Sequence, residues 1–135
     1  MTKKVLVALV VAAAVTVSVG IASAASHQFQ GERSKTALMP VQGSGVTGIV
    51  RLRATPEGET DIVVRARGLQ PGARYASFYY DGHHCEVGPD LVGTFTADSS
   101  GHGRVHGTAD DPIDDIASVS VRTPDYSVLF ACAVF

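Results

Sequence analysis

Two neighbouring histidines, His83 and His84, are the residues whose types and spacing point most directly to chemistry. Imidazole nitrogens bind copper, zinc and nickel, and carboxylates stand nearby in the same polar stretch. Adjacent residues of an extended chain point to opposite sides, so both rings reach one ion only if the chain bends there. The pair therefore has two interpretations, a copper-binding pair or an exposed polar loop.

A second possible set of metal ligands is Ala25, Ser26 and His27. Cleavage after Ala24 would leave a free amine, two backbone amides and the His27 imidazole as four nitrogens in one plane, which suits Cu(II) or Ni(II). The alternative is a flexible tail with an incidental histidine. The set depends on the cleavage point, because a cut one residue later destroys it.

The first 24 residues have the pattern of a secretory signal peptide. Lys3 and Lys4 give a positive start, an apolar stretch covers 5–21, and Ala22-Ser23-Ala24 is a typical cleavage site. The alternative is an uncleaved membrane anchor, for which the apolar stretch is slightly short. We expect cleavage, a mature chain without a membrane span, and a secreted or extracytoplasmic location.

Export would place the cysteines, Cys85 and Cys132, in an oxidising compartment. Two cysteines allow a single intramolecular bridge, and the loop that it closes would stabilise the domain by about 4 kcal/mol on a chain-entropy argument. The alternative is two separate buried thiols. We predict the disulfide.

The charge of the chain argues against a nucleic-acid partner. The chain carries 11 Lys and Arg against 13 Asp and Glu. Removal of Lys3 and Lys4 with the leader leaves 9 against 13, a net charge of −4. Nucleic-acid binding needs clustered positive charge. We therefore expect an extracellular protein or a small ligand as the partner, and no nucleic acid.

The elements that must position these residues are short strands. After a polar segment at 25–44, expected to be flexible, apolar residues alternate with polar ones from residue 45 onward, and no window indicates an amphipathic helix. Short strands separated by turns are typical of an antiparallel β-sandwich, here of about seven strands. The predicted strands are 46–54, 60–69, 73–80, 91–97, 103–108, 116–122 and 126–135.

The third predicted strand, 73–80, is rich in aromatic residues. Alternation puts Tyr75, Ser77 and Tyr79 on one face and the residues between them on the other. If the core takes the second face, the first offers a tyrosine patch to a glycan, peptide or protein. The alternative, which the pattern favours, is core packing on one side and protection of a sheet edge on the other.

Two segments resemble the copper/zinc superoxide dismutase family. The run Gly68-Leu69-Gln70-Pro71-Gly72 is similar to the family's turn before its copper-ligand strand, and Ala131-Cys132-Ala133-Val134 to a segment of its last strand. The family joins that segment by a disulfide to the loop after the copper-ligand strand, and Cys85 and Cys132 stand in these two places. The resemblance covers about residues 45–135 and implies a Greek-key β-sandwich.

The resemblance does not extend to the family's metal ligands. The copper-binding His-x-His pair of the family corresponds to Ser77 and Tyr79, and serine and neutral tyrosine are poor copper ligands. A further histidine and an anion-steering arginine of the family correspond to Leu91 and Leu129. The resemblance therefore implies the scaffold without the catalytic site.

These observations predict a secreted, disulfide-stapled superoxide dismutase-like β-sandwich that is not catalytic and that acts as a binding or structural protein. No cofactor is expected, and copper is the possible exception. The alternative is a copper-binding or superoxide-handling protein with a ligand set foreign to the family. That set would come from Ala25, Ser26 and His27, or from His83 and His84.

Overall fold

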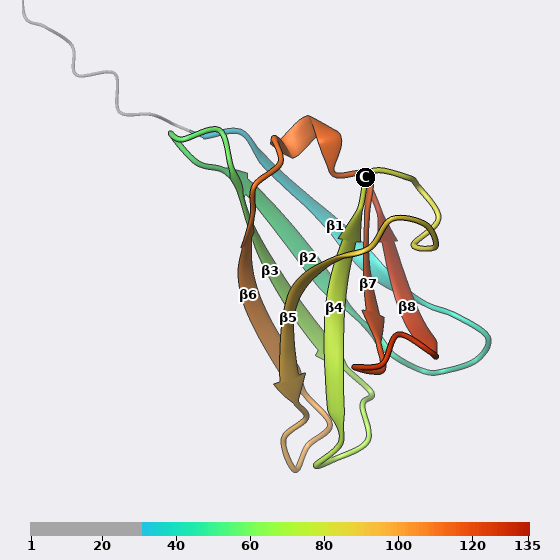
Figure 1. The fold of residues 1–135 in the computed structure, drawn as a ribbon. Helices are drawn as coiled ribbons and strands as arrows, with labels where there is room; N and C mark the ends of the chain where they lie inside the picture. Colours follow the sequence, from blue (N-terminus) through green and yellow to red (C-terminus); the bar gives the residue numbers. More distant parts are fainter. Residues whose placement is uncertain (1–30) are drawn as a thin grey trace, which may run out of the picture.

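Alternating apolar residues build eight antiparallel strands in the computed structural model, which describes residues 31–135 (Figure 1). In this described part, no helix is long and apolar enough to cross a membrane. The elements are β1 (Arg33–Pro40), β2 (Thr47–Ala54), β3 (Thr60–Arg67), β4 (Arg74–Tyr80), β5 (Asp90–Thr96), β6 (Gly103–Ala109), the 3-10 turn η1 (Ile113–Asp115), β7 (Ser118–Arg122) and β8 (Leu129–Val134).

The strands follow the order β5-β4-β7-β8-β1-β2-β3-β6. Strand β1 joins the two halves of the sandwich, because 33–38 pair with β2 while Met39 and Pro40 pair with β8. The outermost strands, β5 and β6, contact each other, so the sandwich nearly closes into a barrel. Strand β3 pairs with β6 and β4 with β7, so the connections cross in a Greek-key pattern. The predicted all-β, antiparallel Greek-key sandwich is confirmed.

Strand β1 lies inside the segment 25–44 that the sequence predicted to be flexible, and it raises the number of strands to eight. Its inward side carries Ser34, Thr36 and Leu38, of which Leu38 alone is fully buried. A strand with one buried apolar residue has almost no hydrophobic alternation, so its pattern does not reveal it. The folded unit therefore includes the chain from Arg33 onward, ahead of the predicted boundary at residue 45.

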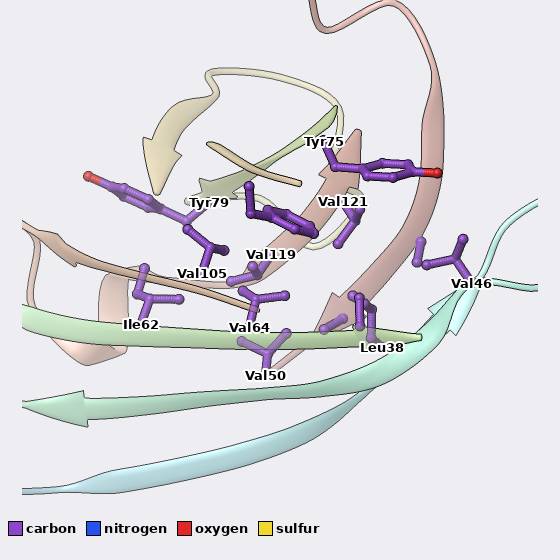
Figure 2. Packing of buried hydrophobic residues seen from close by; sticks show 14 of the residues in the cluster. Leu38, Val46, Val50, Ile62, Val64, Tyr75, Tyr79, Val105, Val119 and Val121 are labelled. Carbon is purple, nitrogen blue, oxygen red and sulfur yellow. The ribbon is translucent and has the colours of Figure 1, made fainter. Parts of the chain in front are cut away.

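The core lies between the inner faces of the two halves (Figure 2). Strands β2 and β3 supply aliphatic side chains, and β4, β5 and β7 supply aromatic and aliphatic ones from the opposite side. The inward and outward positions of β2 and β3 alternate without interruption, as expected of strands with one buried face. Residues at the centre include Val50, Leu52, Ile62, Val64, Tyr75, Phe95, Val119 and Val121.

The contact between β5 and β6 depends on glycines. A side chain at Gly107 would collide with the backbone carbonyl of Val92, and one at Gly103 would collide with the ring of Phe95. Glycine therefore lets the two strands approach closely enough to close the sandwich.

The disulfide between Cys85 and Cys132 is present, with the two Cα atoms 6.1 Å apart, which confirms the predicted pairing. It links the loop between β4 and β5 to the last strand across 47 residues of sequence. The same loop is held on β7, because the Cys85 amide donates a hydrogen bond to the Ser118 hydroxyl, which donates in turn to the Gly82 carbonyl.

Candidate functional site

The structure describes one of the two candidate histidine sites and not the other. Ala25, Ser26 and His27 lie outside the described residues. His83 and His84 are exposed in the loop between β4 and β5, and His83 lines a cleft that His84 does not line. In residues 31–135, no group of three or more His, Cys, Asp or Glu side chains is arranged to hold a metal ion.

Of the two interpretations of the tyrosine face of 73–80, the structure agrees with core packing, which the pattern favoured, and not with an exposed patch. Tyr75, Ser77 and Tyr79 are 5%, 0% and 9% exposed. Figure 2 shows the rings of Tyr75 and Tyr79 among the core side chains, and alternation along β4 puts Ser77 on the same side. The reason is the position of β4, which pairs with β5 on one side and β7 on the other, so its inner face packs against the opposite half of the sandwich. These three residues therefore do not form a free binding face.

The burial of Ser77 and Tyr79 also bears on whether the chain could hold copper at the positions that correspond to the family's ligands. The Ser77 hydroxyl is enclosed and has no hydrogen-bond partner, and Val121 is its neighbour across the strand pair. Tyr79 contributes its ring to the core, and Leu91 is an exposed apolar residue on β5. Neither the donor atoms nor the packing at these positions fit a copper ion.

The outer face of β4 meets a cluster that the sequence did not reveal, formed by Tyr80, Arg122 and Tyr126. The Arg122 guanidinium stacks 4.0 Å from the centre of the Tyr126 ring. The Phe78 ring meets the Tyr126 ring edge to face at 5.0 Å. Arg122 is 9% exposed, and its sequence position at the end of a strand gave no sign that its charge would be buried.

Each nitrogen of the Arg122 guanidinium donates a hydrogen bond to an oxygen. Nε donates to the Tyr80 hydroxyl (3.2 Å), Nη1 to the Tyr126 carbonyl (3.1 Å) and Nη2 to the Cys85 carbonyl (2.7 Å). The Tyr80 hydroxyl also hydrogen-bonds the Ser120 hydroxyl at 2.8 Å. Burial and the neighbouring Tyr80 hydroxyl raise the pKa of Tyr126 to about 12. The cluster thus fastens the disulfide loop to the sheet through the Arg122 cation. In residues 31–135, Arg122 forms no ion pair with a carboxylate.

An acidic cleft of about 640 Å³ opens at the end of the sandwich that carries η1. Tyr79 reaches it from the core, and its hydroxyl points away from the labelled valines in Figure 2. Burial, a hydrogen bond with Asp111 and the charges of Asp111, Asp90 and Asp110 raise the pKa of Tyr79 to about 12, so the hydroxyl keeps its proton. The carboxylates that line the cleft are Glu32, Asp81, Asp90, Asp111, Asp114 and Asp115.

The outer face of β1, β2, β3 and β6 is basic. Alternation along β2 puts Arg51 and Arg53 on its outer side, and alternation along β3 does the same for Arg65 and Arg67. The sequence did not show that β1 and β6 would extend this face with further cations, because β1 was not predicted and the pairing of β6 with β3 joins strands far apart in the sequence. Lys35 lies on β1 and Arg104 on β6.

Comparison with known proteins gives a likeness of fold. No family model matches the chain, and no curated protein matches it. A solved structure described as the clock protein EA4 is similar, with a TM-score of 0.56 and 14% sequence identity over 78% of this chain and 94% of that one. At this identity the likeness concerns the fold alone.

Proposed function

We propose that this chain is an extracytoplasmic, superoxide dismutase-like β-sandwich that acts by binding and not by copper-dependent dismutation. One observation carries the proposal: the two β4 positions that correspond to the family's copper-binding pair, Ser77 and Tyr79, face the packed core. A copper ion at these positions would have to displace core side chains, and a serine hydroxyl and a neutral phenol would hold it weakly.

The outer face of β4 supports the same conclusion. Phe78 and Tyr80 occupy it, and Arg122 and Tyr126 cover them. We therefore propose that the chain keeps the family's scaffold but has no open metal channel beside the disulfide loop. Fold alone does not carry function, so the argument rests on these side chains.

The disulfide supports the extracytoplasmic part of the proposal. Disulfides persist in oxidising compartments, and Cys85 and Cys132 are bonded. The leader pattern at 1–24 agrees with this location. For binding, the molecule offers two surfaces of opposite charge, the acidic cleft near η1 and the basic outer face of β1, β2, β3 and β6.

The test is a Cu(II) titration with a dismutase assay on protein purified from an exporting host, after intact mass has established whether the chain begins at Ala25. The His27→Ala variant removes the amino-terminal nitrogen set, and a His83→Ala/His84→Ala variant removes the loop pair. We expect weak, non-stoichiometric copper binding in the His27→Ala protein and no dismutation above that of buffer containing the same copper.

Tight one-to-one binding in the His27→Ala protein, lost in the loop variant and accompanied by dismutation, would refute the proposal. It would establish the alternative, a superoxide-handling protein with His83 and His84 as ligands. Tight binding that disappears with His27→Ala alone, without dismutation, would place copper on the amino terminus and leave the sandwich non-catalytic.

A further inference from the structure

Positive charge is concentrated on the outer face of one half of the sandwich. Seven of the nine Lys and Arg residues in the described part of the chain occupy outward positions of β1, β2, β3 and β6, and all seven are exposed. We call this surface the basic sheet face. Its cations are Arg33, Lys35, Arg51, Arg53, Arg65, Arg67 and Arg104.

Strand register puts like charges directly opposite one another on this face. Lys35 pairs with Arg51 across β1 and β2, and Arg65 pairs with Arg104 across β3 and β6. Like charges in such positions destabilise a sheet. The arrangement therefore does not serve folding, and an anion lying over the face would relieve the repulsion.

Carboxylates on the face are too few to neutralise it. Asp61 is the single Asp or Glu at the outward positions of these four strands. It lies 3.2 Å from Arg53 and 3.7 Å from His106, and these are the ion pairs found in residues 31–135. Within that described range, the cations other than Arg53 on this face have no carboxylate partner.

Two shallow hollows lie along the same face. One, of about 580 Å³, is lined by Arg33, Lys35, Arg51 and Arg53. The other, of about 560 Å³, is lined by Arg65, Arg67 and Arg104, with Asp98 as its one carboxylate. Successive outward residues of a strand are about 7 Å apart, so the four rows of outward positions extend over about 20 Å. Cations thus recur at regular steps along a pair of hollows on one sheet.

From these observations we propose that the basic sheet face binds a linear anionic polysaccharide. The inference deepens the proposed function, since it names the partner class of the binding module. A flexible chain with repeating charges can follow the hollows and place an anionic group at successive rows. Charged contacts of this kind displace counterions, so the affinity must fall steeply with salt.

Two other anionic partners fit the face less well. A membrane surface would favour apolar side chains that project into the lipid, but Ile49 and Val63 are half-buried between the basic residues. Duplex DNA is read by a helix or a ribbon that enters a groove, and this face is the broad side of a sheet. Export, which the proposed function assumes, also separates the protein from nucleic acid.

The experiment measures heparin binding to the mature full-length protein by calorimetry over a series of salt concentrations. Arg51→Glu and Arg65→Glu change the basic sheet face. Arg74→Glu is the matched control. Arg74 is exposed at the start of β4 in the other half of the sandwich, and its substitution by Glu changes the charge by the same amount. We expect the two face variants to weaken binding at least about fivefold and to flatten the salt dependence, with a change of at most about twofold in the control.

Thermal unfolding separates lost binding from lost folding. Arg65→Glu places a carboxylate opposite Arg104, so this variant should unfold at a temperature equal to or above that of the unchanged protein. No heparin binding at low salt, or equal weakening by all three variants, would overturn the inference. Tighter binding to anionic vesicles or to a DNA duplex than to heparin, with the same sensitivity to Arg65→Glu, would also overturn it.

The two proposals fail separately. If heparin does not bind and copper binding is weak and non-stoichiometric, the polysaccharide partner is rejected and the non-catalytic binding module stands. Dismutation that depends on His83 and His84 removes the proposed function whatever heparin does.

Discussion

At the residue scale, the guanidinium of Arg122 is buried, and protein oxygens replace water as its hydrogen-bond acceptors. Its guanidinium donates to the Tyr80 hydroxyl and to the carbonyls of Tyr126 and Cys85, and its flat side lies on the Tyr126 ring. Hydrogen bonds from a charged group are stronger than neutral ones. Arg122 therefore helps to fix the disulfide loop in place and leaves the exposed histidines of that loop at the surface.

The buried hydroxyl of Ser77 predicts an unusual stabilising substitution. It has no hydrogen-bond partner, so Ser77→Ala should raise the free energy of unfolding by about 1 kcal/mol. Ser120→Ala is the matched control, because Ser120 is equally buried but its hydroxyl pairs with Tyr80. The control should lower that free energy by about 1 kcal/mol. Urea unfolding measures both, and a Ser77→Ala protein less stable than Ser120→Ala would contradict the prediction.

Asp125 predicts a loss of stability in acid. Hydrogen bonds from Ser127, then from Thr123, lower its pKa to about 2 in the folded protein. The folded value lies below the unfolded value of about 4, so the contribution is present above pH 4 and lost as the pH falls through about 2. The backbone amides of His102 and Ser100 lower the pKa of Asp98 in the same direction.

Melting temperatures measured between pH 6 and pH 2 test the role of Asp125. Asp125→Asn should melt below the unchanged protein at pH 6, and the gap should narrow toward pH 2 as the native carboxylate takes up its proton. Asp114→Asn is the control, since Asp114 lies in an exposed turn, and its gap should be small throughout. A gap for Asp125→Asn that is constant with pH would contradict the assignment.

At the element scale, closure of the sandwich depends on the approach of β5 to β6. Gly107→Val would force a side chain against the Val92 carbonyl, so the strands would have to separate. We expect a loss of about 2–4 kcal/mol in the free energy of unfolding. Thr94→Val on the exposed side of β5 is the control, with an expected change within about 0.5 kcal/mol. Equal effects of the two substitutions would show that closure does not depend on this glycine.

The sequence predicts the strands whose pattern is hydrophobic and not the one that is polar. The hairpin of β2 and β3 follows from alternation, since Val50, Leu52, Ile62 and Val64 are all fully buried. Strand β1 could not be predicted from the hydrophobic pattern, because pairing with β2 and β8 holds it in the sheet and its own apolar residues do not. The disulfide could be predicted because the chain has two cysteines.

The candidate sites were harder to predict than the strands. Alternation grouped Tyr75, Ser77 and Tyr79 correctly on one face but could not say which face would meet the core, because both faces of β4 carry aromatic residues. The basic sheet face depends on pairing between strands far apart in the sequence, such as Arg65 with Arg104. Net charge conceals such clustering, because acidic residues elsewhere in the chain cancel it.

At the scale of the whole molecule, the Cys85–Cys132 bond joins a surface loop to the last strand. Its removal in a Cys85→Ser/Cys132→Ser protein releases a loop of 47 residues, which should lower the free energy of unfolding by up to about 4 kcal/mol. Denaturant unfolding of the oxidised protein, the reduced protein and the double variant measures this effect. Agreement between the reduced protein and the variant is the internal control, and full stability in both would contradict a structural role.

The separation of the acidic cleft from the basic sheet face has a practical consequence for handling the protein. The mature chain expected after cleavage has a net charge of −4, so it would be expected to pass through a cation exchanger at neutral pH. Here seven cations share one face while six carboxylates line a cleft at the end that carries η1, so the surface has two patches of opposite charge. It should therefore be retained by both cation and anion exchange resins at low salt, each holding it in a different orientation.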